Sequence, residues 1–133
     1  MASILKVDEL QGIASAGDIT VTSEGGAATQ SLQQGLAKVW ASVDYSGGTP
    51  SAGDSLNVSS FTDNGTGDYD ANFASNMSSS NYGAGGISIH NTRVAAYLNP
   101  ASTDFNVKVY DISISALTTN DAGSKFSIHG DLA

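Results

Sequence analysis

Apolar residues recur at every second position in several short stretches of the chain, and this is the period of a half-buried β-strand. In residues 37–45, Val39, Ala41, Val43 and Tyr45 share one face, while the residues between them are mostly polar. Similar alternation predicts further strands at residues 18–22, 54–61, 69–73, 86–92, 93–98, 104–115 and 125–128, with a bend or bulge near Tyr110–Asp111 in the 104–115 stretch. About six to eight short strands with no long helix predict an all-β fold. We expect an antiparallel β-sandwich or jelly-roll-like domain with an extended N-terminal arm.

Residues 57–73, NVSSFTDNGTGDYDANF, predict a β-hairpin. Two alternating runs flank a turn at Asn64–Gly67, whose asparagine and glycines adopt positive φ at little cost. Phe61 falls out of phase with Val58, so we expect a β-bulge near Ser59–Ser60.

The alternation also assigns directions to side chains in two later strands. In residues 86–92 it predicts that Ile87 and Ile89 point into the core and that His90 points outward. Phe126 and Ile128 predict the same arrangement near the end of the chain, with His129 outward.

Residues 1–30 are too poor in large apolar groups to form a core of their own. Short strands are expected at residues 3–7 and 18–22, and the second would direct Ile19 and Val21 to one side. We therefore predict an attachment and assembly arm over residues 1–30 and a sandwich head over residues 31–133. The alternative for residues 1–30 is a frayed terminus. Ser31 is the expected N-cap of a helical turn that Gly35 interrupts.

The composition restricts the function classes. Five Lys and Arg against thirteen Asp and Glu give a net charge of −8, which disfavours binding to nucleic acid phosphates. The chain has no cysteine, which excludes disulfides and thiolate metal sites. No apolar run is long enough for a signal peptide or a membrane helix.

Two chemical readings of the sequence compete with a purely structural one. The Asp63–Asp70 segment is rich in oxygen ligands, but it does not follow the EF-hand spacing, so we expect neither a metal site nor a cofactor. His90 and His129 are the only histidines, and no nucleophile-elbow motif accompanies them. We therefore expect no enzyme activity, with a glycan depolymerase as the alternative. The three sequons at Asn57, Asn64 and Asn76 are those that chance produces in so Asn- and Ser-rich a chain.

Trp40, the single tryptophan, falls on the polar face of its strand. A large aromatic side chain there either fills a second core layer or contacts another subunit. We assign Trp40, together with Val21 and Ile19, to a subunit interface.

Two segments carry a family resemblance: GLAKVWASVDYSG at residues 35–47 and DSLNVSSFTDNGTGDYDANFASNM at residues 54–77. They resemble a module at the C-terminal ends of tail fibre and related structural proteins of tailed bacteriophages. SILKVDELQ at residues 3–11 is similar to the start of fibre-type proteins from marine and cyanobacterial phages. The resemblance implies a virion component, usually a homotrimer, whose arm binds other virion proteins and whose head faces outward.

By this resemblance the variable loops would recognise a host-surface glycan or protein. We expect them at residues 46–54, 74–86 and 116–124. The candidate receptor-binding residues are Tyr45, Thr49, Asn76, Asn81, Tyr82 and Asn120. The alternative function is a capsid decoration or cement fibre without receptor binding. In either case the protein would be made in the host cytoplasm and would reside in the virion.

Overall fold

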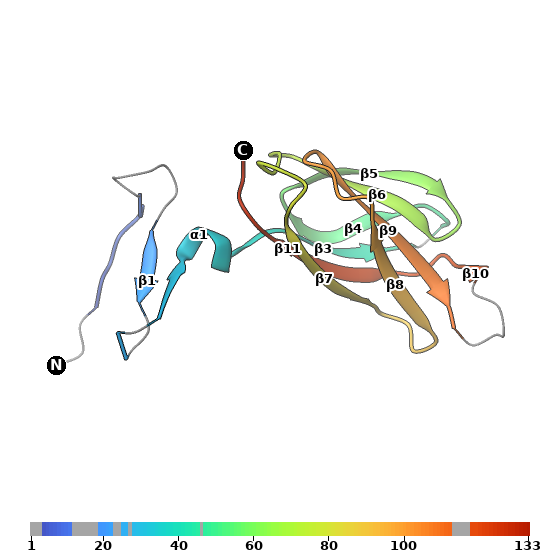
Figure 1. Ribbon diagram of the computed structural model, residues 1–133. Helices are drawn as coiled ribbons and strands as arrows, with labels where there is room; N and C mark the ends of the chain where they lie inside the picture. The colour runs from blue at the N-terminus through green and yellow to red at the C-terminus, as the bar shows by residue number, and fades with distance from the viewer. Residues whose placement is uncertain (1–3, 12–18, 23–24, 27, 46, 113–117) are drawn as a thin grey trace. The chain divides into compact units, whose positions relative to one another are not determined.

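The computed structural model describes residues 4–11, 19–22, 25–26, 28–45, 47–112 and 118–133 (Figure 1). The chain divides into two compact units, Met1–Gly35 and Leu36–Ala133. Residues 46, 116 and 117 of the expected receptor loops lie outside the described residues.

The N-terminal unit is a short hairpin followed by one helical turn. Strand β1 (Thr20–Thr22) pairs antiparallel with β2 (Thr29–Ser31), and α1 (Leu32–Gly35) follows directly. Ser31 caps this turn as predicted, because its Oγ accepts a hydrogen bond from the Gln34 N–H at 3.4 Å. The strand expected at residues 3–7 is wrong, since residues 4–7 pair with no other described segment. Among the residues of this unit that the structure describes, none is buried.

The second unit is an antiparallel sandwich of two sheets, which confirms the predicted fold class (Figure 1). The first sheet has, in spatial order, β4 (Ser51–Leu56), β3 (Ala37–Asp44), β11 (Ser124–His129) and β7 (Gly83–Ser88). The second has β8 (Arg93–Leu98), β9 (Asp104–Asp111), β6 (Asp68–Phe73) and β5 (Val58–Gly65). The two-residue strand β10 (Thr118–Thr119) pairs with the end of β9.

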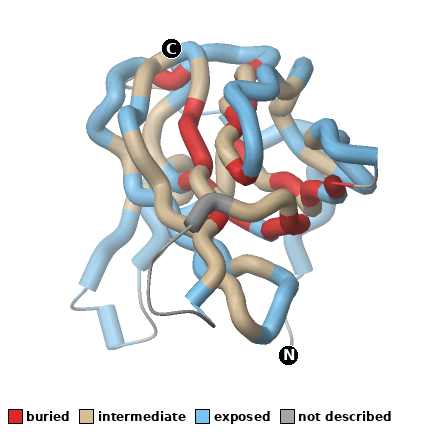
Figure 2. Tube along the Cα trace, turned by 90° about the vertical axis from the view of Figure 1, so that its right-hand side faces the viewer, coloured by how far each residue is buried: buried red, intermediate tan, exposed pale blue. Residues whose placement is uncertain are grey.

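The core lies between the sheets and is built by the central strands β3, β11, β9 and β6 (Figure 2). Their inward positions alternate as the sequence predicts, and the neighbouring segments add Tyr45, Met77 and Ala122. The core residues within these strands are Val39, Ala41, Val43, Tyr69, Ala71, Phe73, Phe105, Val107, Val109, Phe126 and Ile128. The outer strands β4, β5, β7 and β8, which are described in full, carry no buried residue.

The chain passes from one sheet to the other at Asn57, between β4 and β5. Asn57 has a φ of 58°, which few residues other than glycine adopt readily. Its side chain donates to the Ser75 carbonyl at 2.9 Å and accepts from the Ser75 N–H at 2.6 Å. Asn57 therefore fixes both the backbone turn and the segment that follows β6.

The hairpin of β5 and β6 confirms two details of the prediction. Its register shifts between Val58 and Ser60, where a bulge was expected. Gly65 and Gly67 have φ values of 125° and 63° in the turn. The φ of Asn64 is not positive, so the two glycines alone provide the left-handed conformation.

The inward direction predicted for Ile87 and Ile89 is wrong, since their side chains are 65% and 55% exposed. In β7 it is Gly86 that lies opposite Phe126 of β11, and opposed residues share a face of the sheet. A Cβ atom at Gly86 would lie only 2.1 Å from the Tyr97 hydroxyl. The inward position of β7 therefore requires glycine, and Ile87 takes the outward one.

Candidate functional site

The six candidate receptor-binding residues do not form one site, because they divide between the two ends of the sandwich. Tyr45, Thr49 and Asn120 lie at the end that contains the β5–β6 turn, where the Gly67 N–H donates to Asp121 Oδ1 at 2.7 Å. The others, Asn76, Asn81 and Tyr82, lie at the opposite end, where the chain enters the sandwich at Leu36.

Tyr45 cannot act at the surface, because it is 8% exposed and belongs to the core. The alternation of β3 continues one residue beyond the strand and turns this ring inward, 5.7 Å from the Tyr69 ring. Tyr82 is half-buried, and its ring lies 6.2 Å from Phe73 and 6.1 Å from Phe105. This prediction is therefore wrong for Tyr45, and Tyr82 has a packing role.

The other four candidates are more accessible. Thr49, Asn76 and Asn81 are exposed, and Asn120 is half-buried. The Asn120 N–H donates to the Val109 carbonyl at 2.9 Å. The loops are also shorter than expected, because β4 begins at Ser51 and β7 at Gly83.

The residues assigned to a subunit interface lie in different units. Trp40 is half-buried on the outer face of β3, opposite Leu56 of β4 and Ser127 of β11. Val21 is exposed and Ile19 is half-buried; the Ile19 carbonyl accepts from the Leu32 N–H at 2.7 Å. Their role as an interface stays a prediction.

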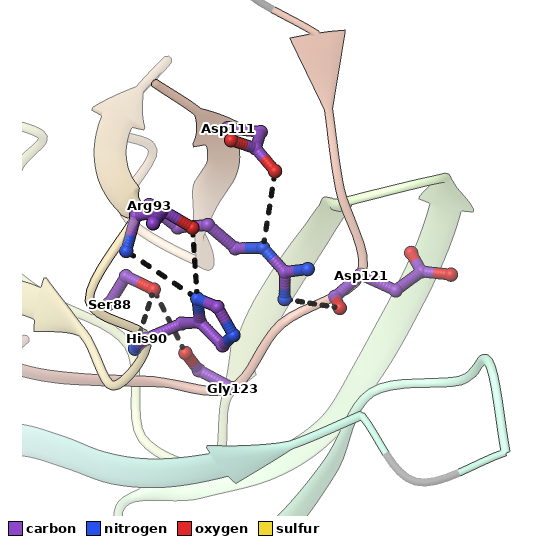
Figure 3. Close-up of polar contacts among 7 residues, drawn as sticks. Ser88, His90, Arg93, Asp111, Asp121 and Gly123 are labelled. Atoms are coloured by element: carbon purple, nitrogen blue, oxygen red, sulfur yellow. Dashed lines mark hydrogen bonds and ion pairs between the residues drawn. The ribbon is translucent and has the colours of Figure 1, made fainter. Parts of the chain in front are cut away.

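The arrangement around His90 is structural rather than that of a nucleophile and base (Figure 3). Its Nδ1 lies 3.2 Å from the Thr92 hydroxyl, and only its backbone N–H reaches Ser88 Oγ. Ser88 Oγ also donates to the Gly123 carbonyl at 3.5 Å, so no imidazole nitrogen activates this serine. His90 is exposed as predicted, and so is His129.

Arg93 joins three parts of the chain beside His90 (Figure 3). Its Nε lies 3.9 Å from Asp111 Oδ2, and its NH1 group donates to the Asp121 carbonyl at 3.3 Å. These contacts tie β8 to the end of β9 and to the segment before β11. We assign Arg93 to holding this end of the sandwich together.

A polar concavity of about 350 Å³ lies on the outer face of the second sheet. It is lined by Asn64, Asp68, Asp70, Asn99, Asp104, Asn106 and Lys108. Strands β6 and β9 build its floor, because their core residues alternate with these polar ones. The register places Asp68 opposite Lys108 and Asp70 opposite Asn106.

Asn106 organises the carboxylates of this concavity. Its Nδ2 donates to Asp68 Oδ1 at 2.8 Å and to Asp70 Oδ1 at 2.7 Å. Asn64 Nδ2 donates to Asp70 Oδ2 at 2.9 Å, and Lys108 Nζ forms an ion pair with Asp68 Oδ2 at 2.9 Å. These contacts therefore fix the orientations of the Asp68 and Asp70 carboxylates.

Burial alone would raise the pKa of Asp68. Hydrogen bonds from Asn106 and Lys108, and the positive charge of Lys108, outweigh this effect and hold the pKa of Asp68 below its usual value. The same ion pair raises the pKa of Lys108. Both groups are therefore charged at neutral pH.

The structure offers no metal centre in the part of the chain that it describes. Within those ranges, no three His, Cys, Asp or Glu residues are grouped so that they could hold an ion. Asp63 instead accepts a hydrogen bond from the Gly65 N–H at 2.9 Å within the hairpin turn. No helix among the described residues has the length and hydrophobicity needed to span a bilayer.

Comparison with protein-family models, with curated proteins and with solved structures gives no match to this chain.

The concavity was not predicted from the sequence, although the sequence does show the polar face of one of its two strands. Asp104, Asn106 and Lys108 alternate with Phe105 and the core valines of β9. That pattern marks a polar outer face, but it does not reveal which strand lies beside β9 or in which register.

Proposed function

We propose that the chain is a structural protein of a bacteriophage particle, a tail fibre or spike component that assembles as a homotrimer. Its N-terminal unit attaches to its own copies and to other virion proteins. Its β-sandwich presents polar surface to the host. The resemblance in residues 35–47 and 54–77 motivates this proposal, and the chemistry of the two units supports it.

The observation that carries the proposal is that the N-terminal unit leaves its apolar side chains exposed. None of its described residues is buried, and Ile4 and Leu5 are each 77% exposed. Val7, Leu10 and Val21 are exposed as well. A segment that exposes these side chains gains stability when a partner covers them, because burial removes their apolar surface from water.

Unlike the N-terminal unit, the sandwich buries a continuous apolar core, and it presents polar groups on the outer face of its second sheet. A rigid β-scaffold of this kind suits display of a recognition surface. Three copies on one fibre, and several fibres on one particle, would convert weak single contacts into firm attachment through avidity.

The assembly part of the proposal is tested by size-exclusion chromatography with light scattering on the full chain. We expect a particle of about 40 kDa, three times the mass of one 13.5 kDa chain. The double variant Leu5→Ser, Val7→Ser should shift the population toward the monomer. Ile87→Ser is the matched control, because it removes a similarly exposed apolar side chain from the sandwich. A wild-type chain that stays monomeric at every concentration would refute assembly.

The location is tested by antibody labelling of intact particles in the electron microscope. Label at the tail tip or tail fibres supports the proposal. Label over the capsid shell supports the alternative of a decoration protein and removes the receptor role. Absence of label from purified particles overturns both.

A further inference from the structure

We infer that Asn64, at the turn between β5 and β6, is a site of spontaneous deamidation, and that Asp63 and Asp70 restrain the reaction by holding the two groups that must meet. Water alone would modify this residue, with no enzyme, and the product would be aspartate or isoaspartate. This chemistry belongs to the turn itself and does not depend on whether the chain is a virion protein.

Asn64 has the sequence context that favours deamidation most, because it is the only asparagine of the chain that precedes a glycine. In this reaction the backbone nitrogen of the following residue attacks the side-chain carbonyl carbon. A glycine has no Cβ atom to obstruct that approach, and its backbone reaches more conformations than that of any other residue. Asn64 and Gly65 are both exposed, so water has access to the turn.

The reaction balances with water as the only co-reactant. The Gly65 nitrogen loses its proton and bonds to Asn64 Cγ, while the Cγ–Nδ2 bond breaks and Nδ2 leaves as ammonia with that proton. The product is a succinimide ring. Water that adds at Cγ restores the normal backbone and leaves aspartate at position 64. Water that adds at the backbone carbonyl carbon leaves Gly65 attached through Cγ, which is isoaspartate.

Asp63 holds the attacking nitrogen. Its Oδ1 accepts a hydrogen bond from the Gly65 N–H at 2.9 Å. The nitrogen attacks only after this proton has left, and a carboxylate that accepts from the N–H favours the protonated form. The negative charge of Asp63 also opposes an anionic nitrogen beside it. Asp63 therefore slows the first step of the reaction.

Asp70 holds the group that is attacked. Asn64 Nδ2 donates to Asp70 Oδ2 at 2.9 Å across the hairpin, and Asn106 Nδ2 fixes Asp70 through its other oxygen at 2.7 Å. The side chain and backbone of Asn64 must both rotate before Cγ comes within bonding distance of the Gly65 nitrogen. The contact with Asp70 opposes this rotation, and so does the pairing of Gly65 with Asp68 in the hairpin.

Deamidation would replace the attraction between residue 64 and Asp70 with repulsion. A neutral donor becomes a carboxylate, which only accepts hydrogen bonds and carries a negative charge. Asp70 and Asp68 already place negative charge on this face, so a third carboxylate is unfavourable there. Isoaspartate also lengthens the backbone at the point where the register shifts between Asp63 and Gly65. Modified chains should therefore have a weaker β5–β6 hairpin.

The test is peptide mapping by mass spectrometry while the full chain is incubated in mildly alkaline buffer. In guanidinium chloride, where these contacts are absent, Asn64 should be the first asparagine to convert. In the folded chain its conversion should be roughly tenfold slower, the factor that one hydrogen bond to a charged group can supply. Earlier conversion of another asparagine in the unfolded chain would overturn the assignment of the site. Equal rates at Asn64 in the folded and unfolded chains would overturn the restraint.

Matched variants identify the first restraining group. Asp63→Ala frees the Gly65 N–H and should speed conversion in the folded chain by roughly three- to tenfold. Asp63→Asn keeps an acceptor oxygen and should speed it less. Asp54→Ala on β4 is the control, because Asp54 Oδ1 accepts from the Ser55 N–H at 2.9 Å and the same charge and kind of contact are lost on the other sheet. Equal acceleration by Asp54→Ala and Asp63→Ala would show that the contact with Gly65 does not set the rate.

Two further variants test the second contact and the consequence. Asp70→Ala, or Asp70→Asn if the first does not fold, should also speed conversion, and an unchanged rate would remove Asp70 from the restraint. Asn64→Asp reproduces one product. At neutral pH it should unfold at a lower urea concentration than wild type, and the difference should shrink in acid as the carboxylates become protonated. A midpoint equal to that of wild type at neutral pH would refute the weakening of the hairpin.

Discussion

At Gly86, the backbone of β7 lies very close to the backbone of β11 and to the Tyr97 side chain of β8. An added Cβ atom would lie 2.1 Å from the Tyr97 hydroxyl, 2.2 Å from the Lys125 carbonyl oxygen and 2.8 Å from the Phe126 Cα. Two of these three neighbours are backbone atoms of β11, which cannot rotate away. We therefore expect Gly86→Ala to force β7 away from its neighbour strand.

The expected loss follows from two opposing terms. Overpacking of a well-packed site typically costs about 1–3 kcal/mol, and a backbone obstacle places Gly86 at the upper end of that range. Alanine in a strand recovers about 0.5–1 kcal/mol of backbone entropy relative to glycine. We expect a net loss of about 2 kcal/mol in the free energy of unfolding. For a domain of about 100 residues this lowers the melting temperature by roughly 8–16 °C.

Gly85→Ala is the matched control in the adjacent position of the same strand. A Cβ atom there meets no heavy atom within 4 Å, so this variant should be neutral or more stable by up to about 1 kcal/mol. Urea unfolding followed by the fluorescence of Trp40, the single tryptophan, measures both variants. Equal stability of the two variants would refute the close approach.

Tyr97→Phe provides an internal check on the same contact. The Tyr97 hydroxyl is buried and has no hydrogen-bond partner among the residues that the structure describes, and its ring stacks on Phe105 at a centroid distance of 5.2 Å. Removing the hydroxyl should leave stability unchanged or increase it, since an unpaired buried hydroxyl is a cost. Combined with Gly86→Ala it should recover part of the loss, with the Lys125 carbonyl still in the way. A double variant no better than Gly86→Ala would assign the whole clash to the backbone.

Three further predictions concern the sheet crossing and the titrating groups. Asn57→Ala should lower the free energy of unfolding, measured in urea, by about 2–3 kcal/mol, because it removes both hydrogen bonds to Ser75 and strains a φ of 58°. Asn57→Gly removes the same bonds without the strain and should lose about half as much. Equal losses would mean that the backbone conformation contributes nothing. The depressed pKa of Asp68 provides stability that is fully present above its ordinary value of 3.8 and is lost as the pH falls through the lower folded-state pKa. Wild type should therefore exceed Asp68→Asn in urea midpoint at neutral pH and converge with it in acid, and a constant difference would contradict this origin. Burial, helped by the charge of Asp104 at Tyr82, raises the pKa of Tyr82 and of Tyr97 from 10.0 to about 12. Stability should then fall as the pH rises above 10, and phenolate absorbance that is the same in folded and urea-unfolded protein would show that these rings are not protected.

Local patterns were sufficient for the strands whose two faces differ clearly in polarity. In β3, β6, β9 and β11 the period of two identifies both the strand and its buried face, because apolar residues recur at every second position, with Trp40 of β3 as an aromatic exception on the outer face. The bulge near Ser59 was also predictable, since Phe61 is out of phase with Val58.

The errors arose where a distant residue decides the outcome. The phase of β7 depends on Tyr97 and on the β11 backbone, and neither can be read from the glycine-rich segment itself. The concavity needs the register that sets Asp70 beside Asn106, thirty-six positions away along the chain. Tyr45 is a different case, because the alternation of residues 37–45 already places it on the buried face of Val43, which the receptor-binding assignment did not take into account.

The inner strands supply the buried core and the outer strands do not, and this difference determines where the sequence can vary. Since β4, β5, β7 and β8 supply none of the fully buried side chains, most of their outward positions are open to new residues without repacking the interior. Substitutions at these outward positions and in the bordering loops would therefore leave the packing of the inner four strands unchanged.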